Sequence, residues 1–347
     1  MRYPRPLRKG GTIGFLAPSF GCATEPYRSL FLHAQDIWKE KGYQLLLGPN
    51  CYASEGVGIS SLPEKCGAEV MELFLSDADC LISCGGGELM CEILPYVDFQ
   101  RLAREEPKWF MGYSDNTNLT YLLATLADTA SVYGPCAAAF GMEPWHKALS
   151  DAFGILTGEQ KVVDSYGRWE KESLKDEEHP FVPYNLTEKL NLHCYIGGCP
   201  AGIQPVIFHG RLLGGCMDCL VNLLGTRFDH TIEFTERYKE DGIIWFLEAC
   251  DLNVFSIRRA MWQMEEAGWF QHVKGFLIGR PANGEPMMGL DADSAILEIA
   301  ARKGVPVVTG VDLGHLPPAM PLVTGSIGTV TVNGEGNTMK IEMDYHG

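Results

Sequence analysis

The sequence has 347 residues, of which 46% are apolar and 21% are charged, a balance typical of a globular protein that can bury a substantial core. Its net charge of −16 argues against nucleic acid as a partner, because a polyphosphate requires a concentrated basic face, and against adhesion to an anionic membrane surface. This length favours two domains.

The first ten residues are basic but lack the apolar core of a secretory signal, and no apolar run reaches the roughly 18 residues that a membrane-spanning helix needs. Without a signal peptide, the twelve cysteines are expected to be free thiols in a reducing compartment. We therefore predict a cytoplasmic protein.

The N-terminal part alternates strands with helices, the pattern of a mostly parallel sheet. Strands are predicted at 12–17, 43–47 and 80–83, and the last delivers the run Gly85-Gly86-Gly87 at its carboxyl end, where open α/β sheets bind ligands. This run lacks both the Lys-Ser/Thr of a P-loop and the spacing of a dinucleotide fingerprint. It is better interpreted as exposed backbone that can approach a substrate closely.

Gly112-Tyr113-Ser114-Asp115 follows an apolar run at 109–111 and precedes a helical stretch at 118–124. Ser114 is thereby predicted at a strand-to-helix corner, the geometry of a nucleophile elbow. Asn116 occupies the second glycine position of the G-x-S-x-G pattern, and serine at such a corner is also a common helix N-cap. Both interpretations of Ser114 stay open from this segment.

The first domain is expected to end near residue 157. Residues 158–195 lose their periodicity and gather charge, which predicts a linker or an insert over the cleft between the domains. Trp169, Phe181 and Tyr184 favour contact with a ligand, whereas a solvated connector is the alternative.

A second α/β domain follows, with strands predicted at 205–208, 243–247, 275–278 and 305–308 and a terminal hairpin turned at Asn333-Gly334. Cys216 and Cys219 form a Cys-x-x-Cys pair, but an apolar helix start follows them, so no metal site is predicted.

Two polar side chains follow strands of this second domain. Glu248 follows 243–247, and His315 ends a glycine-punctuated loop after 305–308. Taken singly, Glu248 could be a carboxylate at a helix N-terminus and His315 a surface histidine. With Ser114 they would supply a nucleophile, a base and a group that orients the base.

These motifs, together with Gly210–Gly215 and Leu224-Gly225-Thr226, resemble in their order the LD-carboxypeptidase family, the S66 serine peptidases, over nearly the whole chain. The resemblance implies an N-terminal domain (1–157) like that of class I glutamine amidotransferases, a connecting segment (158–195) and a C-terminal α/β domain (196–347).

The resemblance also implies the site residues. Ser114 would be the nucleophile, His315 the general base and Glu248 the orienting carboxylate. The oxyanion hole would use the backbone N–H groups of Gly86 and Asp115, with Gly87 as the alternative to Gly86. No metal or organic cofactor would be needed.

The resemblance further implies a small peptide substrate, an L,D-peptide bond of muropeptides in murein recycling, and a homodimer. A microcin C immunity-type hydrolase of peptidyl- or aminoacyl-nucleotide conjugates is the alternative, and an inactive binding protein for small ligands is a third. Gly87 and Cys216 are expected to contact substrate, although the family generally carries asparagine at the position of Cys216. A cysteine hydrolase is disfavoured because Ser114 occupies the elbow.

Overall fold

The computed structural model describes residues 1–334 and 337–345 and divides into two compact units. Of the described residues, unit 1 comprises Met1–Gln160 and Glu172–Asn185, and unit 2 comprises Lys161–Lys171 and residues 186–345. The segment 158–195 is thus shared by both units. Within the described residues, no helix is long and apolar enough to cross a membrane.

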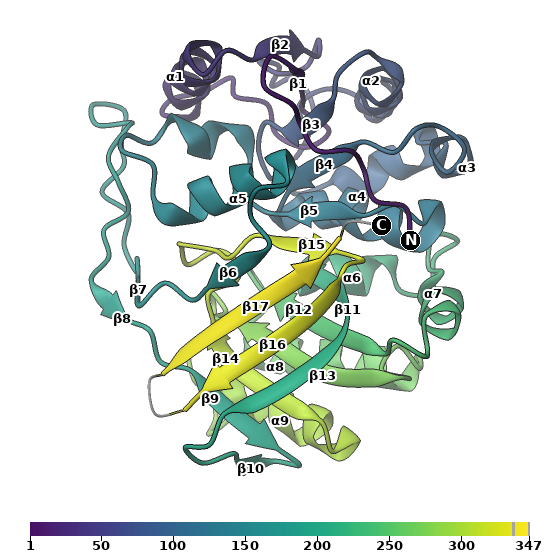
Figure 1. The fold of residues 1–347 in the computed structure, drawn as a ribbon, viewed down its shortest axis with the longest axis vertical. Helices are drawn as coiled ribbons and strands as arrows, with labels where there is room; N and C mark the ends of the chain where they lie inside the picture. Colours follow the sequence, from purple (N-terminus) through teal and green to yellow (C-terminus); the bar gives the residue numbers. More distant parts are fainter. Residues whose placement is uncertain (335–336, 346–347) are drawn as a thin grey trace. The chain divides into compact units, whose positions relative to one another are not determined.

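Unit 1 is built on a parallel sheet with the strand order β5-β4-β3-β1-β2. Figure 1 shows helices around this sheet. The central strands are buried along nearly their whole length, as parallel strands covered on both faces should be. The elements are β1 (Thr12–Leu16), α1 (Tyr27–Glu40), β2 (Gln44–Leu47), α2 (Pro63–Leu75), β3 (Cys80–Ser83), η1 (Met90–Tyr96), α3 (Phe99–Leu102), β4 (Trp109–Gly112), η2 (Ser114–Asn116), α4 (Thr117–Ala127), β5 (Ser131–Tyr133), η3 (Ala137–Gly141) and α5 (Lys147–Thr157).

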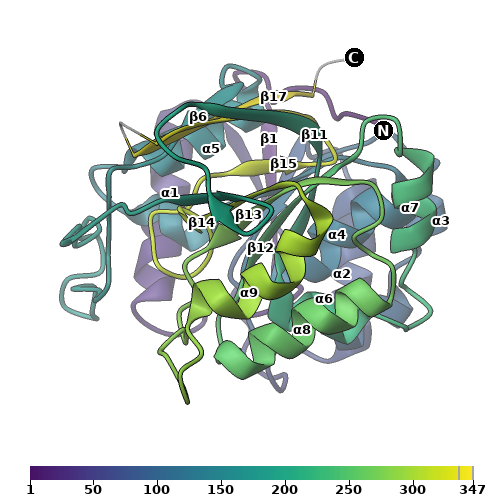
Figure 2. The same cartoon turned by 90° about the horizontal axis from the view of Figure 1, so that it is seen from below.

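Unit 2 contains a nine-stranded sheet with the order β10-β9-β14-β13-β12-β11-β16-β17-β6. Strands β11 to β14 are parallel, and antiparallel strands flank them on both sides. Figure 2 shows α6, α8 and α9 as a layer along these strands. The nine strands are β6 (Val162–Asp164), β9 (His193–Ile196), β10 (Cys199–Pro200), β11 (Val206–Cys216), β12 (Ile243–Glu248), β13 (Val273–Gly279), β14 (Pro306–Val311), β16 (Ile327–Asn333) and β17 (Thr338–Asp344). β15 (Leu322–Thr324) is not a strand of this sheet, and β7 (Arg168–Trp169) and β8 (Glu188–Lys189) form a separate ribbon. The helices are α6 (Met217–Leu223), α7 (Thr231–Arg237), α8 (Val254–Glu266), α9 (Ala292–Ala300) and η4 (Ala301–Lys303).

The predicted α/β class with parallel sheets in two parts is confirmed, and two local predictions are wrong. The strand expected at 205–208 continues to Cys216, because residues 211–216 pair in register with β12, as Gly214 does with Phe246. Asn333 is not a turn residue but the last paired residue of β16, opposite Thr338. Residues 335 and 336 lie outside the described residues.

The register of unit 2 positions two of the predicted site residues. Cys216 at the end of β11 pairs with Glu248 at the end of β12. Because these strands are parallel, both side chains lie at the carboxyl edge of the sheet, the edge at which open α/β sheets bind their ligands.

Candidate active site

Ser114 lies at the turn between β4 and α4, as the sequence predicts. Its φ angle is 63°, in the left-handed region that residues other than glycine rarely adopt. A strained serine between a strand and a helix is the backbone signature of a nucleophile elbow. The residue that directly precedes α4 is Asn116, so the structure does not place Ser114 in the helix-cap position.

The glycine run after β3 packs against this serine. A Cβ atom added to Gly86 would lie 3.2 Å from both Cβ and Oγ of Ser114. Asn116 Nδ2 donates to the Gly85 carbonyl oxygen at 2.8 Å, which ties the elbow to the glycine run. Asn116 appeared in the sequence only as the residue in place of a glycine, and its side-chain role was missed.

Asp115 connects three further segments of unit 1. Its buried carboxylate accepts hydrogen bonds from Ser19 Oγ at 2.5 Å, from the Met90 N–H at 2.9 Å and from Asn118 Nδ2 at 3.1 Å. Burial raises the pKa of Asp115 to about 6. Gly87 lies beside the same network, because an added Cβ there would fall 2.0 Å from Ser19 Oγ. The sequence predicted only the backbone N–H of Asp115 as functional.

Glu248 and His315 are in contact within unit 2. His315 Nδ1 lies 2.9 Å from Glu248 Oε2, and since a carboxylate only accepts, Nδ1 carries the proton. Glu248 is 2% exposed at the end of β12. Gly314 must be glycine here, because its φ is 94° and a Cβ would lie 2.5 Å from Glu248 Oε2. The motif Gly-His in the sequence therefore reflects the close approach of this loop to the carboxylate.

The charge on Glu248 governs the titration of His315. Burial alone would lower the pKa of the ring, but the Glu248 carboxylate and the Cys250 side chain outweigh it and raise the pKa of His315 to about 11. Glu248 therefore favours the protonated form of the His315 ring.

Cys216 is directed toward Asp218 and not toward open solvent. Its thiol is 2% exposed and donates to Asp218 Oδ2 at 3.3 Å. Contact with Cys219, followed by burial, raises the pKa of the Cys216 thiol, so it stays neutral. In the part of the chain that the structure describes, no group of three or more His, Cys, Asp or Glu side chains is placed to hold a metal ion.

Asp218 fixes the segment that follows Glu248, a role that the sequence did not reveal. Its carboxylate accepts from the backbone N–H groups of Cys250 at 3.0 Å, Asp251 at 3.0 Å and Leu252 at 3.1 Å. These three bonds span more than 30 residues of chain, so spacing in the sequence gives no signal for them.

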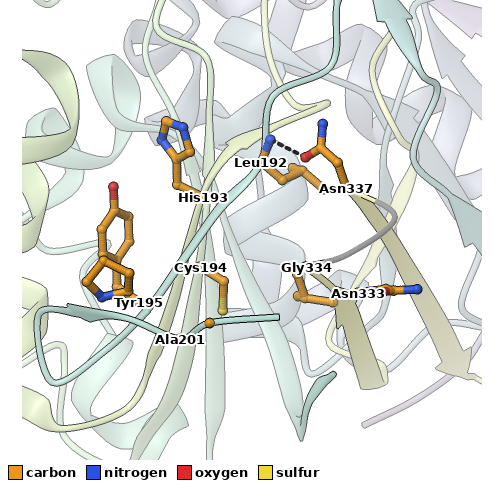
Figure 3. A pocket seen from close by; sticks show the side chains of 11 residues that line it. Leu192, His193, Cys194, Tyr195, Ala201, Asn333, Gly334 and Asn337 are labelled. Carbon is orange, nitrogen blue, oxygen red and sulfur yellow. Dashed lines mark hydrogen bonds between the residues drawn. The ribbon is translucent and has the colours of Figure 1, made fainter. Parts of the chain in front are cut away.

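A hollow of about 270 Å³ in unit 2 lies away from these residues. Figure 3 shows its lining, which comes from Leu192 and β9, from residues 200–202, from the end of β16 with Gly334, and from Asn337. Asn337 accepts from the Leu192 N–H at 2.8 Å there. None of the predicted site residues lines this hollow, so it is not part of the candidate active site.

Two family models match the chain. The LD-carboxypeptidase N-terminal domain matches residues 13–134, and the LD-carboxypeptidase C-terminal domain matches residues 209–330. Together they span more than half of the sequence.

Relatives match over nearly the whole chain. The microcin C7 self-immunity protein MccF of Escherichia coli is 25% identical over 328 residues, which cover 92% of this chain and 90% of that protein. A Bacillus subtilis protein named "probable murein peptide carboxypeptidase" is 25% identical over 328 residues, with 93% and 89% covered.

Solved structures share the fold. MccF in complex with aspartyl sulfamoyl adenosine matches with a TM-score of 0.80 at 22% identity, covering 100% of both chains. The muramoyltetrapeptide carboxypeptidase from Oxalobacter formigenes matches with a TM-score of 0.70 at 19% identity, covering 97% of this chain and 100% of that one. The chain therefore belongs to the LD-carboxypeptidase family, the S66 serine peptidases.

Proposed function

We propose that this protein is a serine carboxypeptidase-type hydrolase in which Ser114, His315 and Glu248 act together as a catalytic triad. The observation that carries the proposal is the strained conformation of Ser114, which lies against a glycine run in one unit, together with the 2.9 Å contact of His315 and Glu248 in the other. Both are the local arrangements that acyl transfer by a serine requires.

The proton transfers follow from the tautomer of His315. In the neutral ring Nδ1–H donates to Glu248, so Nε2 is the nitrogen that takes the Ser114 proton during attack on the scissile carbonyl and later gives it to the leaving amine. General base catalysis of this kind contributes about 10²–10⁴-fold in rate. Water then hydrolyses the acyl-enzyme, so the mechanism requires no metal or organic cofactor.

The oxyanion hole would consist of backbone N–H groups. Gly86 packs on Ser114, and Asp115 is the residue directly after Ser114. We therefore assign the two donors to Gly86 and Asp115, with Gly87 as the alternative to Gly86. Loss of one such donor costs about 3 kcal/mol of transition-state stabilisation.

We propose the L,D-peptide bond of muropeptides, in murein recycling, as the scissile bond. Family membership and the named carboxypeptidase relatives support this choice. A second candidate is a conjugate of an aminoacyl or peptidyl group with a nucleotide, which the likeness to MccF bound to aspartyl sulfamoyl adenosine supports. Cys216 is buried at a position where the family generally carries asparagine, so a substrate contact at this position would be made by a thiol in place of an amide. We also expect a cytoplasmic homodimer.

The test is to incubate the purified protein separately with a muropeptide tetrapeptide and with an aminoacyl-sulfamoyl adenylate, and to identify products by mass spectrometry. Release of the terminal D-residue supports the first substrate, and release of the nucleotide part supports the second. Ser114→Ala is the control for a contaminating hydrolase. If neither substrate is cleaved but both Ser114→Ala and the parent bind one of them, the protein is an inactive binding protein on the same fold.

A further inference from the structure

The loop that carries His315 is held by a buried ion pair. Arg280 directly follows β13 and is 9% exposed. Its Nη1 donates to the Gly310 carbonyl oxygen at 2.9 Å, and its Nη2 donates to the Leu316 carbonyl oxygen at 3.2 Å. One guanidinium thus bonds the backbone on both sides of His315.

Asp312 completes the pair from within the loop. It is fully buried, and its Oδ1 lies 2.8 Å from Arg280 Nη1. Its other oxygen, Oδ2, accepts from the Tyr166 N–H at 2.7 Å. The pair therefore connects the His315 loop to residues 166–170, a segment that contains β7 and is called the strap below.

The same strap covers the ion pair. The Trp169 ring lies over the Arg280 guanidinium, with its centroid 5.0 Å from Cζ, and the Glu170 N–H donates to the Pro317 carbonyl oxygen at 2.7 Å. The loop is consequently held by hydrogen bonds or an ion pair at Gly310, Asp312, Leu316 and Pro317, each at most five residues from His315.

Such bonding is needed because the loop is flexible by composition. Gly310 and Gly314 flank the segment with φ angles of 73° and 94°, and glycine loses more conformational freedom on ordering than any other residue. A planar guanidinium with donors in a fixed fork suits the task, because it can bond two carbonyl groups and a carboxylate at once.

We propose that Arg280 and Asp312 are positioning residues that hold His315 against Glu248. This inference rests on the proposed function for its catalytic consequence, but the placement of the imidazole can be tested separately.

Unit 2 offers a matched control in Arg211 and Asp241. Arg211 is 7% exposed, its Nε donates to Asp241 Oδ2 at 3.0 Å, and its guanidinium lies 3.8 Å from the centroid of the Tyr238 ring. It also donates to a backbone carbonyl, that of Gly325. Arg211 pairs in register with Ile243, the first residue of β12, whereas Glu248 is the last residue of that strand. The pair contains the same two side chains with a similarly buried arginine, but Asp241 is 34% exposed and the His315 loop is not involved.

The experiment compares the neutral pairs R280Q/D312N and R211Q/D241N, each checked for folding by thermal unfolding. The imidazole is followed by NMR of protein labelled with ¹⁵N-histidine, with His315→Gln used to assign the resonances. In the parent, Nδ1 of His315 is protonated and bonded to Glu248. We expect R280Q/D312N to lose this signature and to lower kcat about 10- to 100-fold while changing KM little, since a small displacement of a catalytic group is costly. We expect R211Q/D241N to keep both the parental His315 signature and the parental kcat.

A folded R280Q/D312N protein that keeps the parental His315 signature and kcat would overturn the proposal, as would an equal loss in R211Q/D241N. If R280Q/D312N does not fold, Arg280→Lys replaces it, because lysine keeps the charge beside Asp312 but cannot bond both carbonyl groups. Its expected effects have the same direction and are smaller, and a parental result for both readouts again overturns the proposal. If the parent cleaves neither substrate, the proposed function fails while the NMR comparison still decides the positioning role.

Discussion

The two groups of predicted catalytic residues are held in place by different physical means. In unit 1, Ser114 is fixed by its own backbone conformation, with a φ of 63°, and by the packing of Gly86. In unit 2, His315 lies in a glycine-containing loop that charged side chains hold, namely Glu248, Arg280 and Asp312. The backbone conformation of Ser114 places it without a distant charge, whereas the position of the His315 loop depends on several charged side chains. The two regions should therefore respond differently to changes of charge and of pH.

The largest effect is expected from Ser114→Ala. Removal of the nucleophile should lower hydrolysis by several orders of magnitude. The free energy of unfolding should change by less than about 1 kcal/mol, because the strain lies in the backbone and alanine adopts the same φ at a similar cost. Steady-state kinetics and urea unfolding measure the two quantities. Parental turnover in this variant on a confirmed substrate would refute the assignment of Ser114.

Glu248→Gln is expected to have the next largest effect, a loss of about 10²–10⁴-fold in kcat, because an amide cannot stabilise the imidazolium. It should also move the pH profile. The base must be neutral, so the rate rises with pH through the pKa of His315, which Glu248 holds well above its ordinary value. Without the carboxylate, the rising limb should shift to lower pH. A limb at the parental pH would show that Glu248 does not control His315.

The same ion pair should affect stability in alkaline solution. Since the folded pKa of His315 is raised, its contribution to stability is complete below about pH 6.5 and is lost as the pH rises through about 11. Glu248→Gln should flatten this part of the stability profile. Chemical unfolding of parent and variant from pH 7 to 10 measures it, and parallel curves would contradict the ion pair.

Asn116→Ala tests how the glycine run is held in unit 1. Loss of the bond to the Gly85 carbonyl should loosen a predicted oxyanion donor and lower kcat by about tenfold, less than complete removal of a donor. Asn50→Ala is the matched control, because Asn50 is also buried in unit 1 and its Nδ2 donates to the Lys65 carbonyl oxygen, not to the glycine run. Equal losses of kcat in the two variants would argue against a specific role for Asn116.

The smallest effect on activity is expected from Asp115→Asn, which tests whether the stability of unit 1 depends on charge. The folded pKa of Asp115 is raised to about 6, so this group binds its proton more tightly when folded and weakens the fold as the pH rises from about 4 to 6. Asparagine removes that term, which is at most about 3 kcal/mol. The stability of the variant relative to the parent should therefore increase across this range. A constant difference would show that the carboxylate is not perturbed.

The sequence predicted the parts of the site that local pattern encodes. A buried strand followed by a polar residue indicated Ser114 and Glu248, and the glycine-punctuated loop after the last predicted strand indicated His315, although the close approach of Gly314 to Glu248 was not predicted. The partners of Asp218 and Arg280 could not be predicted in this way. Their bonds join segments about 30 residues or more apart, and a single charged residue in a sequence carries no information about which backbone groups it will meet.

Strand length in unit 2 was underestimated for a related reason. Glycine normally argues against a strand interior, but the register of β11 with β12 and β16 keeps the glycine-rich end of β11 paired. Tertiary pairing thus outweighed local propensity at the strand end that brings Cys216 beside Glu248.

An acyl-enzyme on Ser114, formed with His315 and Glu248 as base and orienting group, can be observed directly by trapping it. The parent and Glu248→Gln would be mixed with the confirmed substrate, quenched with acid during the first turnover and digested for peptide mass spectrometry. We predict a mass increase equal to the acyl part of the substrate on the peptide that contains Ser114, and none in Ser114→Ala. Rapid hydrolysis with the acyl group on another residue, or with turnover retained in Ser114→Ala, would contradict the account.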